Sequence, residues 1–225
     1  MAIFDEEAKD YDSWYTTKMG EFVDKVETDH AFSLFKPEAG MKILDVGCGT
    51  GNFSIKLAEM GCKVIAIDQS KEMLEKARQK SEIKGLDIEF ICMDVYNIDF
   101  PDEEFDGVFS MAAFEFIKEP KKAYDEMYRV IREKGSLLIG TINLKSKWGE
   151  LYSSEWFQEN TVFKYADFKS MDDMKSLNIK EVVDSGECLY IPPATEEEII
   201  SLELEKELSA IEEGGFISVL WQKGI

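Results

Sequence analysis

The sequence predicts an α/β protein with a doubly wound parallel sheet, and three observations favour this class. Between residues 42 and 143, apolar runs as long as buried strands alternate with stretches of helical periodicity. A turn that contains Gly47, Gly49 and Gly51 joins the first apolar run to the first helix. The chain has 225 residues, of which 44% are hydrophobic, so it can bury one good core. A single domain over residues 1–225 is therefore expected.

The charge of the chain limits its partners. A formal net charge of −20 would repel phosphate backbones and anionic membrane surfaces, so no nucleic-acid or membrane partner is expected. No stretch approaches the roughly 20 apolar residues of a membrane span, and the first ten residues lack the features of a signal peptide. We therefore expect a cytoplasmic protein, as a monomer or homodimer, that acts on a small molecule.

No metal site is predicted. The four cysteines form no C-x-x-C pair and read as reduced, mostly buried thiols: Cys48, Cys62, Cys92 and Cys188. An acidic run over residues 99–106 could ligate magnesium, but such a run is more often a solvated loop. The sequence leaves that choice open.

Residues 1–36 are predicted to form an N-terminal helical lid. The first 15 residues place apolar and aromatic side chains at helical spacing: Phe4, Ala8, Tyr11 and Tyr15, with Trp14 beside them. This segment could simply pack on the core, or it could close over a ligand and exclude water. A second helix over residues 21–35 puts Phe22, Val26 and His30 on one stripe, so His30 is expected to be packed rather than catalytic.

The core over residues 37–144 begins with a strand, a glycine turn and a helix. Residues 42–46 form the strand, and residues 52–60 form the helix with Phe53, Leu57 and Met60 on one face. The glycines allow positive φ and close approach to a ligand, which is expected at the carboxyl end of the strand. An acid, Asp45, lies two residues before the first glycine.

With this acid, the stretch KILDVGCGTGNF resembles the first motif of class I S-adenosylmethionine-dependent methyltransferases, of the small-molecule type 11/25 kind. The resemblance implies S-adenosyl-L-methionine as cofactor and a seven-stranded Rossmann-like sheet in the order 3-2-1-4-5-7-6 with strand 7 antiparallel. It also implies that Asp45 faces the methionine amino group through water or backbone. The segment AKDYDSWY resembles the tyrosine-bearing lead segment that folds over the cofactor in such enzymes.

Two further acids follow strands. Residues 63–68 form a second strand that ends at Asp68, which the resemblance assigns to the ribose hydroxyls. Asp68 could instead cap the next helix, but Ser70 already supplies a cap. Residues 88–92 form a third strand, after which Asp94 and Val95 resemble the contacts to adenine, although Asp94 could merely end the strand.

The resemblance thus implies a set of cofactor-binding residues: Tyr11, Tyr15, Asp45, Gly47, Cys48, Gly49, Gly51, Asp68, Gln69, Met73, Asp94, Val95 and Ser110.

The fourth strand, residues 105–111, leads to the catalytic candidates. Glu115 follows it as a candidate general base or acceptor ligand, or alternatively as a helix-start carboxylate favoured by the dipole. Tyr11 is the second catalytic candidate. The Asn/Asp-Pro-Pro-aromatic motif of amino-methylating DNA and protein enzymes is absent from the sequence. A helix from Pro120 to Gly135 and a fifth strand over residues 136–143 complete this core.

Residues 145–178 are predicted to cap the carboxyl edge of the sheet. Their aromatics are too irregular for one amphipathic helix, and they could also form a satellite cluster under a loop. Trp148, Tyr152 and Trp156 are the candidate substrate contacts, with a short helix over residues 172–177 after them.

Residues 179–225 are predicted to add strands 181–191 and 216–222, with an acidic helix between them. A capping box of Thr195 and Glu198 would start this helix, whose outward glutamates form a solvated face. Its inward residues are expected to be Ile200, Leu204, Leu208 and Ile211.

The function that these expectations favour is methyl transfer from S-adenosylmethionine to a small or medium-sized acceptor. An NAD-dependent oxidoreductase is an alternative, because a glycine turn and Asp68 would also suit a dinucleotide. A non-catalytic regulator that binds the cofactor and a protein partner is another.

Overall fold

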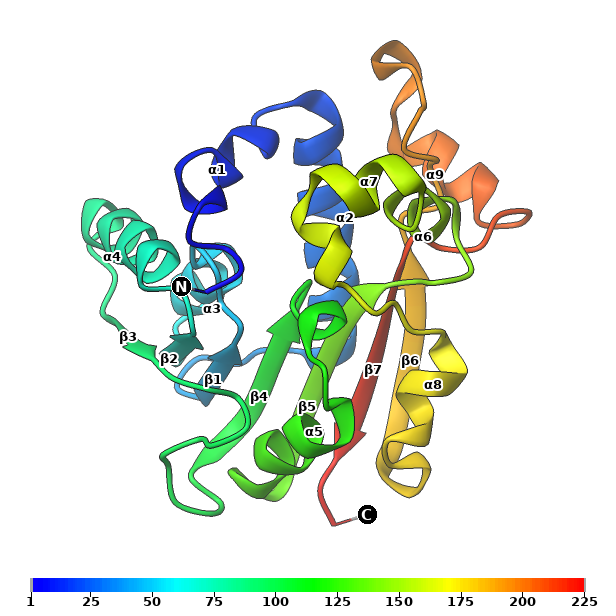
Figure 1. Ribbon diagram of the computed structural model, residues 1–225. Helices are drawn as coiled ribbons and strands as arrows, with labels where there is room; N and C mark the ends of the chain where they lie inside the picture. Colours follow the sequence, from blue (N-terminus) through cyan, green and yellow to red (C-terminus); the bar gives the residue numbers. More distant parts are fainter. Residues whose placement is uncertain (1, 225) are drawn as a thin grey trace.

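One mixed sheet forms the centre of the molecule. The computed structural model describes residues 2–224, so Met1 and Ile225, the two ends of the predicted domain, lie outside the described residues. Seven strands are ordered β3-β2-β1-β4-β5-β7-β6 (Figure 1). They are β1 (Lys42–Val46), β2 (Lys63–Asp68), β3 (Ile88–Cys92), β4 (Phe105–Met111), β5 (Ile131–Ile142), β6 (Val182–Cys188) and β7 (Phe216–Gln222). Only β7 runs antiparallel to its neighbours, which confirms the predicted fold class and strand order.

Helices cover both faces of this sheet. The α-helices are α1 (Tyr11–Trp14), α2 (Lys18–Phe35), α3 (Asn52–Glu59), α4 (Lys71–Lys84), α5 (Pro120–Arg129), α6 (Lys147–Tyr152), α7 (Glu155–Asn160), α8 (Met171–Ser176) and α9 (Leu202–Leu208). Short 3-10 turns are η1 (Glu7–Lys9), η2 (Phe114–Phe116), η3 (Val162–Tyr165), η4 (Ile179–Glu181) and η5 (Glu197–Ile199). No helix within residues 2–224 has the length and apolarity needed to cross a bilayer.

Two apolar layers hold the helices to the sheet. Residues of α2, α3 and α4 pack on one face, where Phe109 of β4 is fully buried and contacts the ring of Phe35 at 5.4 Å. Residues of α5 and α8 pack on the other, where Tyr124 meets Trp221 of β7 edge to face at 5.2 Å. Burying an aromatic side chain of this size contributes about 1.5–3 kcal/mol. The layers therefore fix the strands whose ends carry the site.

Three segments gather above the carboxyl ends of the parallel strands. They are the N-terminal segment with η1 and α1, the turn η2 after β4, and the stretch with α6, α7 and η3 (Figure 1). The predicted lid and cap thus lie at the edge where the ligand was expected. The single N-terminal helix predicted from the spacing of Phe4, Ala8, Tyr11 and Tyr15 is instead broken into η1 and α1.

The boundary between α5 and β5 differs from the prediction. The helix ends at Arg129 instead of Gly135, and Ile131 already belongs to β5, where it pairs with Phe105 of β4. Gly135 lies inside this strand. A Cβ at that position would be 2.7 Å from the carbonyl oxygen of Asp106, so glycine is needed for the close approach of the two strands rather than for a helix end.

The acidic helix also begins later than predicted. Ser201, not Thr195, caps α9, because its hydroxyl accepts a hydrogen bond from the backbone N–H of Leu204. One glutamate of the helix faces inward. The carboxylate of Glu205 accepts hydrogen bonds from the backbone N–H groups of Tyr190 and Ile191, each at 3.0 Å. Those two donors follow β6, which ends at Cys188 instead of Ile191.

Two of the residues that were predicted to face the core are exposed instead. Met60 and Ile211 are exposed, so neither is the core residue that its helical spacing predicted. Both lie at or beyond the ends of their helices, where the spacing no longer applies. His30 is half-buried against Gly186 of β6, and burial lowers the pKa of its imidazole. It is a packed residue, as predicted.

Candidate functional site

The glycine turn is tied to β2 by its backbone. The N–H groups of Gly47 and Cys48 donate to the carbonyl oxygen of Ile67 at 2.8 and 3.1 Å. All three glycines have positive φ, and a Cβ on Gly47 would come within 2.5 Å of the Cβ of Ala113. A Cβ on Gly49 would meet nothing within 4 Å among the described residues. The turn therefore leaves free space beside Gly49, where a ligand can approach the backbone.

Asp45 lies behind this turn rather than in front of it. The side chain is buried, and its Oδ2 accepts a hydrogen bond from the hydroxyl of Ser54 in α3. Burial raises the pKa of Asp45 to about 7, and the charge of Asp68 adds to this shift. The carboxyl group connects β1 to α3, the two elements that the turn joins.

Asp68 connects β2 to both the glycine turn and α4. Its Oδ2 accepts a hydrogen bond from the N–H of Gly49 at 2.9 Å, and its Oδ1 accepts one from the N–H of Ser70 at 2.8 Å. Ser70 is the cap of α4, as the sequence predicted, since it accepts from the N–H of Met73. A carboxylate has about four acceptor positions, so Asp68 can still receive two ligand hydroxyls.

The third strand supplies the opposite wall. Met93, Asp94 and Val95 follow β3 and line the same cavity as Asp68. The Oδ1 of Asp94 accepts a hydrogen bond from the N–H of Tyr96 at 2.9 Å, which fixes the turn after the strand. The carboxylate of Asp94 is exposed at the cavity edge.

The N-terminal segment is held over the glycine turn by polar contacts. The hydroxyl of Ser70 donates to Asp5 at 2.7 Å. Asp12 accepts a hydrogen bond from Thr50 at 2.7 Å and forms an ion pair with Lys80 at 3.0 Å. These contacts join the N-terminal segment to the glycine turn, to the cap of α4 and to α4 itself, all more than 30 positions away in the sequence. The segment thus lies over the site in the described structure.

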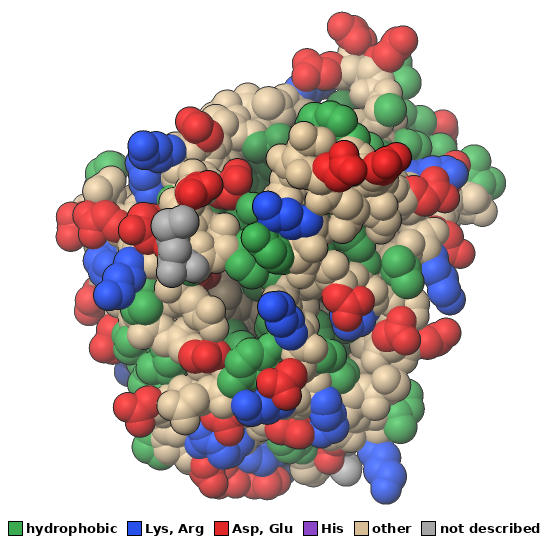
Figure 2. All heavy atoms as spheres, in the orientation of Figure 1, with side chains coloured by type: hydrophobic (Ala, Val, Ile, Leu, Met, Phe, Trp, Pro, Cys, Tyr) green, Lys and Arg blue, Asp and Glu red, His purple; other side chains and the backbone are tan. Residues whose placement is uncertain are grey.

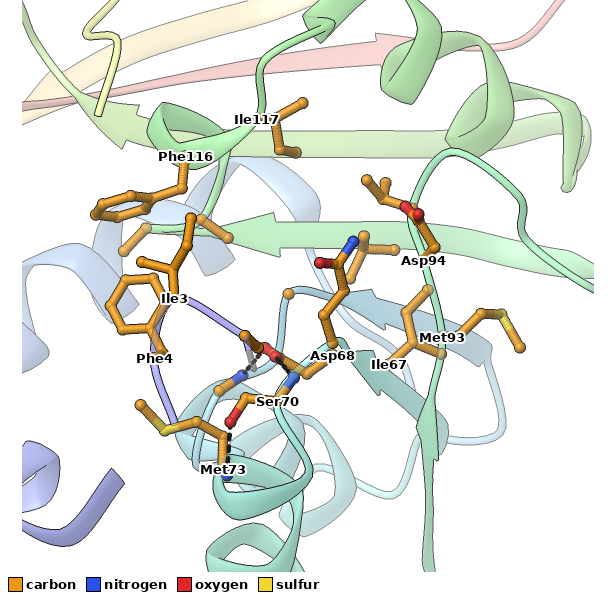
Figure 3. A pocket seen from close by; sticks show the side chains of 18 of the residues that line it. Ile3, Phe4, Ile67, Asp68, Ser70, Met73, Met93, Asp94, Phe116 and Ile117 are labelled. Carbon is orange, nitrogen blue, oxygen red and sulfur yellow. Dashed lines mark hydrogen bonds between the residues drawn. The ribbon is translucent and has the colours of Figure 1, made fainter. Parts of the chain in front are cut away.

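These elements enclose a cavity of about 440 Å³. Ile3 and Phe4 lie beside Phe116 on one side of it, and Met93 and Asp94 lie on the other (Figure 3). Acidic side chains are scattered over this face of the molecule, and hydrophobic ones surround a hollow near its centre (Figure 2). Pockets of about 300–1,000 Å³ with apolar walls and few polar groups are typical small-molecule sites.

The cavity fits the cofactor that the motif implies. A nucleoside needs an acceptor for its ribose hydroxyls and an apolar slot for its base, and Asp68 and the side chains of Ile67 and Val95 offer these. The space beside Gly49 leaves room for the rest of the ligand.

The cavity contains some of the predicted cofactor residues and not others. Those that line it are Tyr11, Gly47, Gly49, Asp68, Gln69, Met73, Asp94 and Val95. The others lie outside its wall: Tyr15, Asp45, Cys48, Gly51 and Ser110. Gly51 caps α3 with φ of 79°, and the buried hydroxyl of Ser110 has no hydrogen-bond partner among the described residues. Sequence spacing identified the strand ends, and the structure decides which side chains reach the cavity.

Glu115 is buried under the N-terminal segment. It is 1% exposed and lies in the single turn η2, so it does not start a helix of any length. Its Oε2 accepts a hydrogen bond from the hydroxyl of Thr141 in β5 at 2.8 Å. Burial raises the pKa of Glu115 to about 7. Its neighbours Ala113 and Phe116 line the cavity.

Glu27 of α2 carries a second buried carboxyl group, which the sequence pattern did not predict. Glu27 is 8% exposed, and burial together with the charge of Glu115 raises its pKa to about 8. A signal was present, because Val23, Glu27 and Ala31 recur every four residues and all three are buried. The predicted stripe of Phe22, Val26 and His30 was offset from them by one residue.

The three predicted substrate contacts lie in different environments. Tyr152 stacks on Phe163 at 4.0 Å between ring centroids. Trp148 is buried, and its indole N–H donates to the carbonyl oxygen of Ile191 at 2.9 Å, which holds the cap to the end of β6. Trp156 is 62% exposed. None of these three side chains lines the cavity.

The acidic run over residues 99–106 lies at the amino end of β4, away from the cavity. Four of its acids pair with basic side chains: Asp102 with Arg129, Glu103 with Lys223, Glu104 with Lys42 and Asp106 with Arg132. No group of His, Cys, Asp or Glu within residues 2–224 is placed to hold a metal ion. The described cysteines are free thiols, and Cys92 is exposed rather than buried.

Comparison with known proteins gives one family. Residues 44–139 match the model of a methyltransferase domain. An uncharacterized protein of Methanocaldococcus jannaschii is 30% identical over 229 residues, which cover 99% of this chain and 100% of that protein. A demethylmenaquinone methyltransferase of Clavibacter sepedonicus is 36% identical over 141 residues, 61% of this chain and 56% of that enzyme. The chain spans about half the length of several other named methyltransferases that it matches.

A solved structure shows the same fold. It is a protein of Thermotoga maritima named as a SAM-dependent methyltransferase and possible histamine N-methyltransferase. It aligns with a TM-score of 0.73 at 23% identity and covers 99% of both chains.

Proposed function

The chain belongs to the class I S-adenosylmethionine-dependent methyltransferases, and from this premise we propose that it methylates a small or medium-sized acceptor, neutral or cationic and partly apolar. The observation that carries this proposal is the cover over the cavity. Phe4 and Tyr11 line it from the N-terminal segment, and the ring of Phe4 packs edge to face on that of Phe116 at 4.7 Å between centroids. A partly covered cavity of this volume suits a small molecule, and the charge of −20 disfavours polyanions.

The residues of the chain have to bind the cofactor and the acceptor and orient them toward each other. Strong activation of either one is not required of them. When bound, S-adenosylmethionine supplies a methyl group that its positively charged sulfur already activates. Asp68 would hold the ribose hydroxyls, Asp94 and Val95 would contact the adenine, and Asp45 would act through the backbone of the turn. The N-terminal segment would exclude water and align the acceptor with the methyl group. A general base, with Glu115 as the candidate, is optional in such a transfer.

The acceptor side would be built from the aromatic segment and η2. Tyr152 presents an apolar ring and a polar hydroxyl, which suits a partly apolar acceptor. We assign Trp148 to the support of this wall and leave Trp156 as an outer contact. The name of the Clavibacter relative also gives a small acceptor, demethylmenaquinone. A cytoplasmic location and a monomeric or homodimeric state remain part of the proposal.

Calorimetry with S-adenosylmethionine, its demethylated product S-adenosylhomocysteine, and NAD tests the binding half of this proposal. We expect both sulfur compounds to bind and to raise the melting temperature, whereas NAD does not. Tighter binding of NAD than of the methyl donor would contradict the assignment. Formation of S-adenosylhomocysteine with a panel of acceptors tests turnover. A protein that binds the cofactor but methylates nothing would be a regulator.

A further inference from the structure

The buried carboxyl group of Glu27 has no hydrogen-bond or ion-pair partner within residues 2–224. No hydrogen bond or ion pair joins it to any other residue in the described part of the chain, although Glu27 is only 8% exposed. Lys56 is the cation whose charge acts on Glu27, and its ammonium group forms an ion pair with Asp24 instead. A buried carboxyl group without a partner costs free energy. A group from outside the protein is therefore the partner to look for.

Four side chains from other elements interact electrostatically with Glu27. Glu115 of η2 interacts electrostatically with it, and the carboxylate of Glu115 is held by the hydroxyl of Thr141 and by the backbone N–H of Glu115 itself. The negative charges of both glutamates act on Tyr11 and on Tyr152, and together with burial they raise the pKa values of the two phenols. Tyr15 feels the charge of Glu27, and its ring lies 5.8 Å from that of Tyr11. Segments far apart in the sequence thus bring two carboxyl groups and three phenols together.

This cluster of Glu27, Glu115, Tyr11, Tyr15 and Tyr152 adjoins the cofactor cavity. Tyr11 belongs to both, because it lines the cavity and interacts with the two glutamates. Phe116, the residue after Glu115, also lines the cavity. A ligand group held by the cluster would therefore lie next to the space assigned to the cofactor.

We infer that the cluster binds the amino group of the acceptor, so that the substrates of this enzyme are primary or secondary amines methylated on nitrogen. The inference rests on the proposed function. An ammonium group offers several donors and no acceptor, which matches carboxylates and phenol oxygens, and aromatic faces attract a cation. A carboxylate or phosphate on the acceptor would be repelled by each glutamate that is ionised.

The reaction balances with these groups alone and the methyl donor. The amine binds as an ammonium ion and gives one proton to a carboxylate of the pair, which frees the lone pair on nitrogen. That lone pair forms the new carbon–nitrogen bond while the carbon–sulfur bond breaks and its electrons stay on sulfur. The methylated nitrogen then carries the positive charge. The carboxylic acid later releases its proton to water, so one proton is produced for each methyl group transferred.

Calorimetric titration of the protein saturated with S-adenosylhomocysteine tests this inference without turnover. The probes are butylamine, benzylamine and 2-phenylethylamine, each compared with the alcohol of the same carbon skeleton. We expect at least one amine to bind about 10- to 100-fold more tightly than its alcohol, as a charge-assisted hydrogen bond requires. Glu27→Gln and Glu115→Gln should remove this preference and leave the affinity for the alcohol unchanged.

Two further variants show whether the effect belongs to the site. Glu21→Gln, on the exposed side of α2, is the matched control and should leave amine binding unchanged. Tyr152→Phe removes one hydroxyl at nearly constant volume and should weaken amine binding while the affinity for S-adenosylhomocysteine stays the same. That affinity also serves as the check that each variant is folded.

The outcomes separate the inference from the function on which it rests. If S-adenosylhomocysteine binds but no amine binds more tightly than its alcohol, the inference is wrong and the methyltransferase function stands. Retention of the amine preference in Glu27→Gln would also overturn it. If S-adenosylhomocysteine itself does not bind, the proposed function fails together with the inference.

Discussion

The cofactor side and the acceptor side of the cavity use their polar groups in opposite ways. On the cofactor side, the carboxyl groups of Asp45 and Asp68 already hold Ser54, Gly49 and Ser70, all within 20 residues of them. On the acceptor side, Glu27 has no partner among residues 2–224 and is surrounded by side chains from distant segments. The first arrangement stabilises the fold, and the second leaves binding capacity for a ligand.

The largest effect should come from a change that fills the cofactor side. In Gly47→Ala, the new Cβ would lie 2.5 Å from that of Ala113 and the residue would keep a φ of 70°. We expect affinity for S-adenosylhomocysteine, measured by calorimetry, to fall by at least about 100-fold because the turn must move. Gly85→Ala is the control, with a φ of 66° and open space around it far from the turn. An equal loss of affinity in both variants would mean that backbone strain alone causes the effect.

The two tryptophans of the acceptor side should differ strongly in stability. Trp148→Ala removes a buried side chain and its hydrogen bond to Ile191, so the free energy of unfolding should fall by about 3–5 kcal/mol. Trp156→Ala, at an exposed position, should change it by less than about 0.5 kcal/mol. Denaturant unfolding of both variants measures this difference. Similar values would mean that the cap is not anchored through Trp148.

A smaller change is expected at Asp68. Asp68→Ala should weaken S-adenosylhomocysteine binding by about 1–3 kcal/mol, since ribose hydroxyls would lose a charged partner. Unchanged affinity in calorimetry would remove the ribose role and leave only the two backbone contacts of this side chain.

The pH dependence of stability should distinguish the two sides further. The pKa of Glu27 is raised from about 4.5 to about 8 in the folded protein, so the folded state binds a proton that the unfolded state has lost. The contribution of Glu27 to the free energy of unfolding is therefore fully present below about pH 4.5. It is lost as the pH rises toward 8, by up to about 1.4 kcal/mol per pH unit. Around it lie Glu115, Asp24, Lys56, Tyr11, Tyr15, Tyr152 and Cys188.

Unfolding of Glu27→Gln at several pH values checks this account. The free energy of unfolding of the variant should decline less than that of the wild type between pH 5 and 8. Near pH 8 the variant should be the more stable protein, because glutamine resembles the protonated acid. Glu21→Gln should follow the wild type. A wild-type curve without any decline assignable to Glu27 would mean that its carboxylate is stabilised by a group not yet identified.

The sequence could predict the cofactor side well for physical reasons. Strands such as β1 and β2 are short apolar runs bounded by glycine or an acid, and the cap at Ser70 is local. The acceptor side depends on packing between segments that are far apart in the sequence. The spacing of apolar residues within one segment does not predict such packing. Glu27 was not predicted to be buried because an acid on a helix is ordinarily solvated. The N-terminal segment and α9 likewise make long-range contacts, of Asp12 with Thr50 and of Glu205 with Ile191, that sequence periodicity does not contain.

A crystal structure with S-adenosylhomocysteine bound tests most directly whether the two sides form one active site. We predict that the ribose lies on Asp68, the adenine lies beside Val95, and the sulfur faces the side of the cavity formed by Tyr11 and Phe116. The carboxyl groups of Glu27 and Glu115 would then lie beyond the sulfur, where the acceptor must approach. A ligand with its sulfur directed away from Tyr11, or a continuous apolar wall between the sulfur and Glu27, would contradict the account.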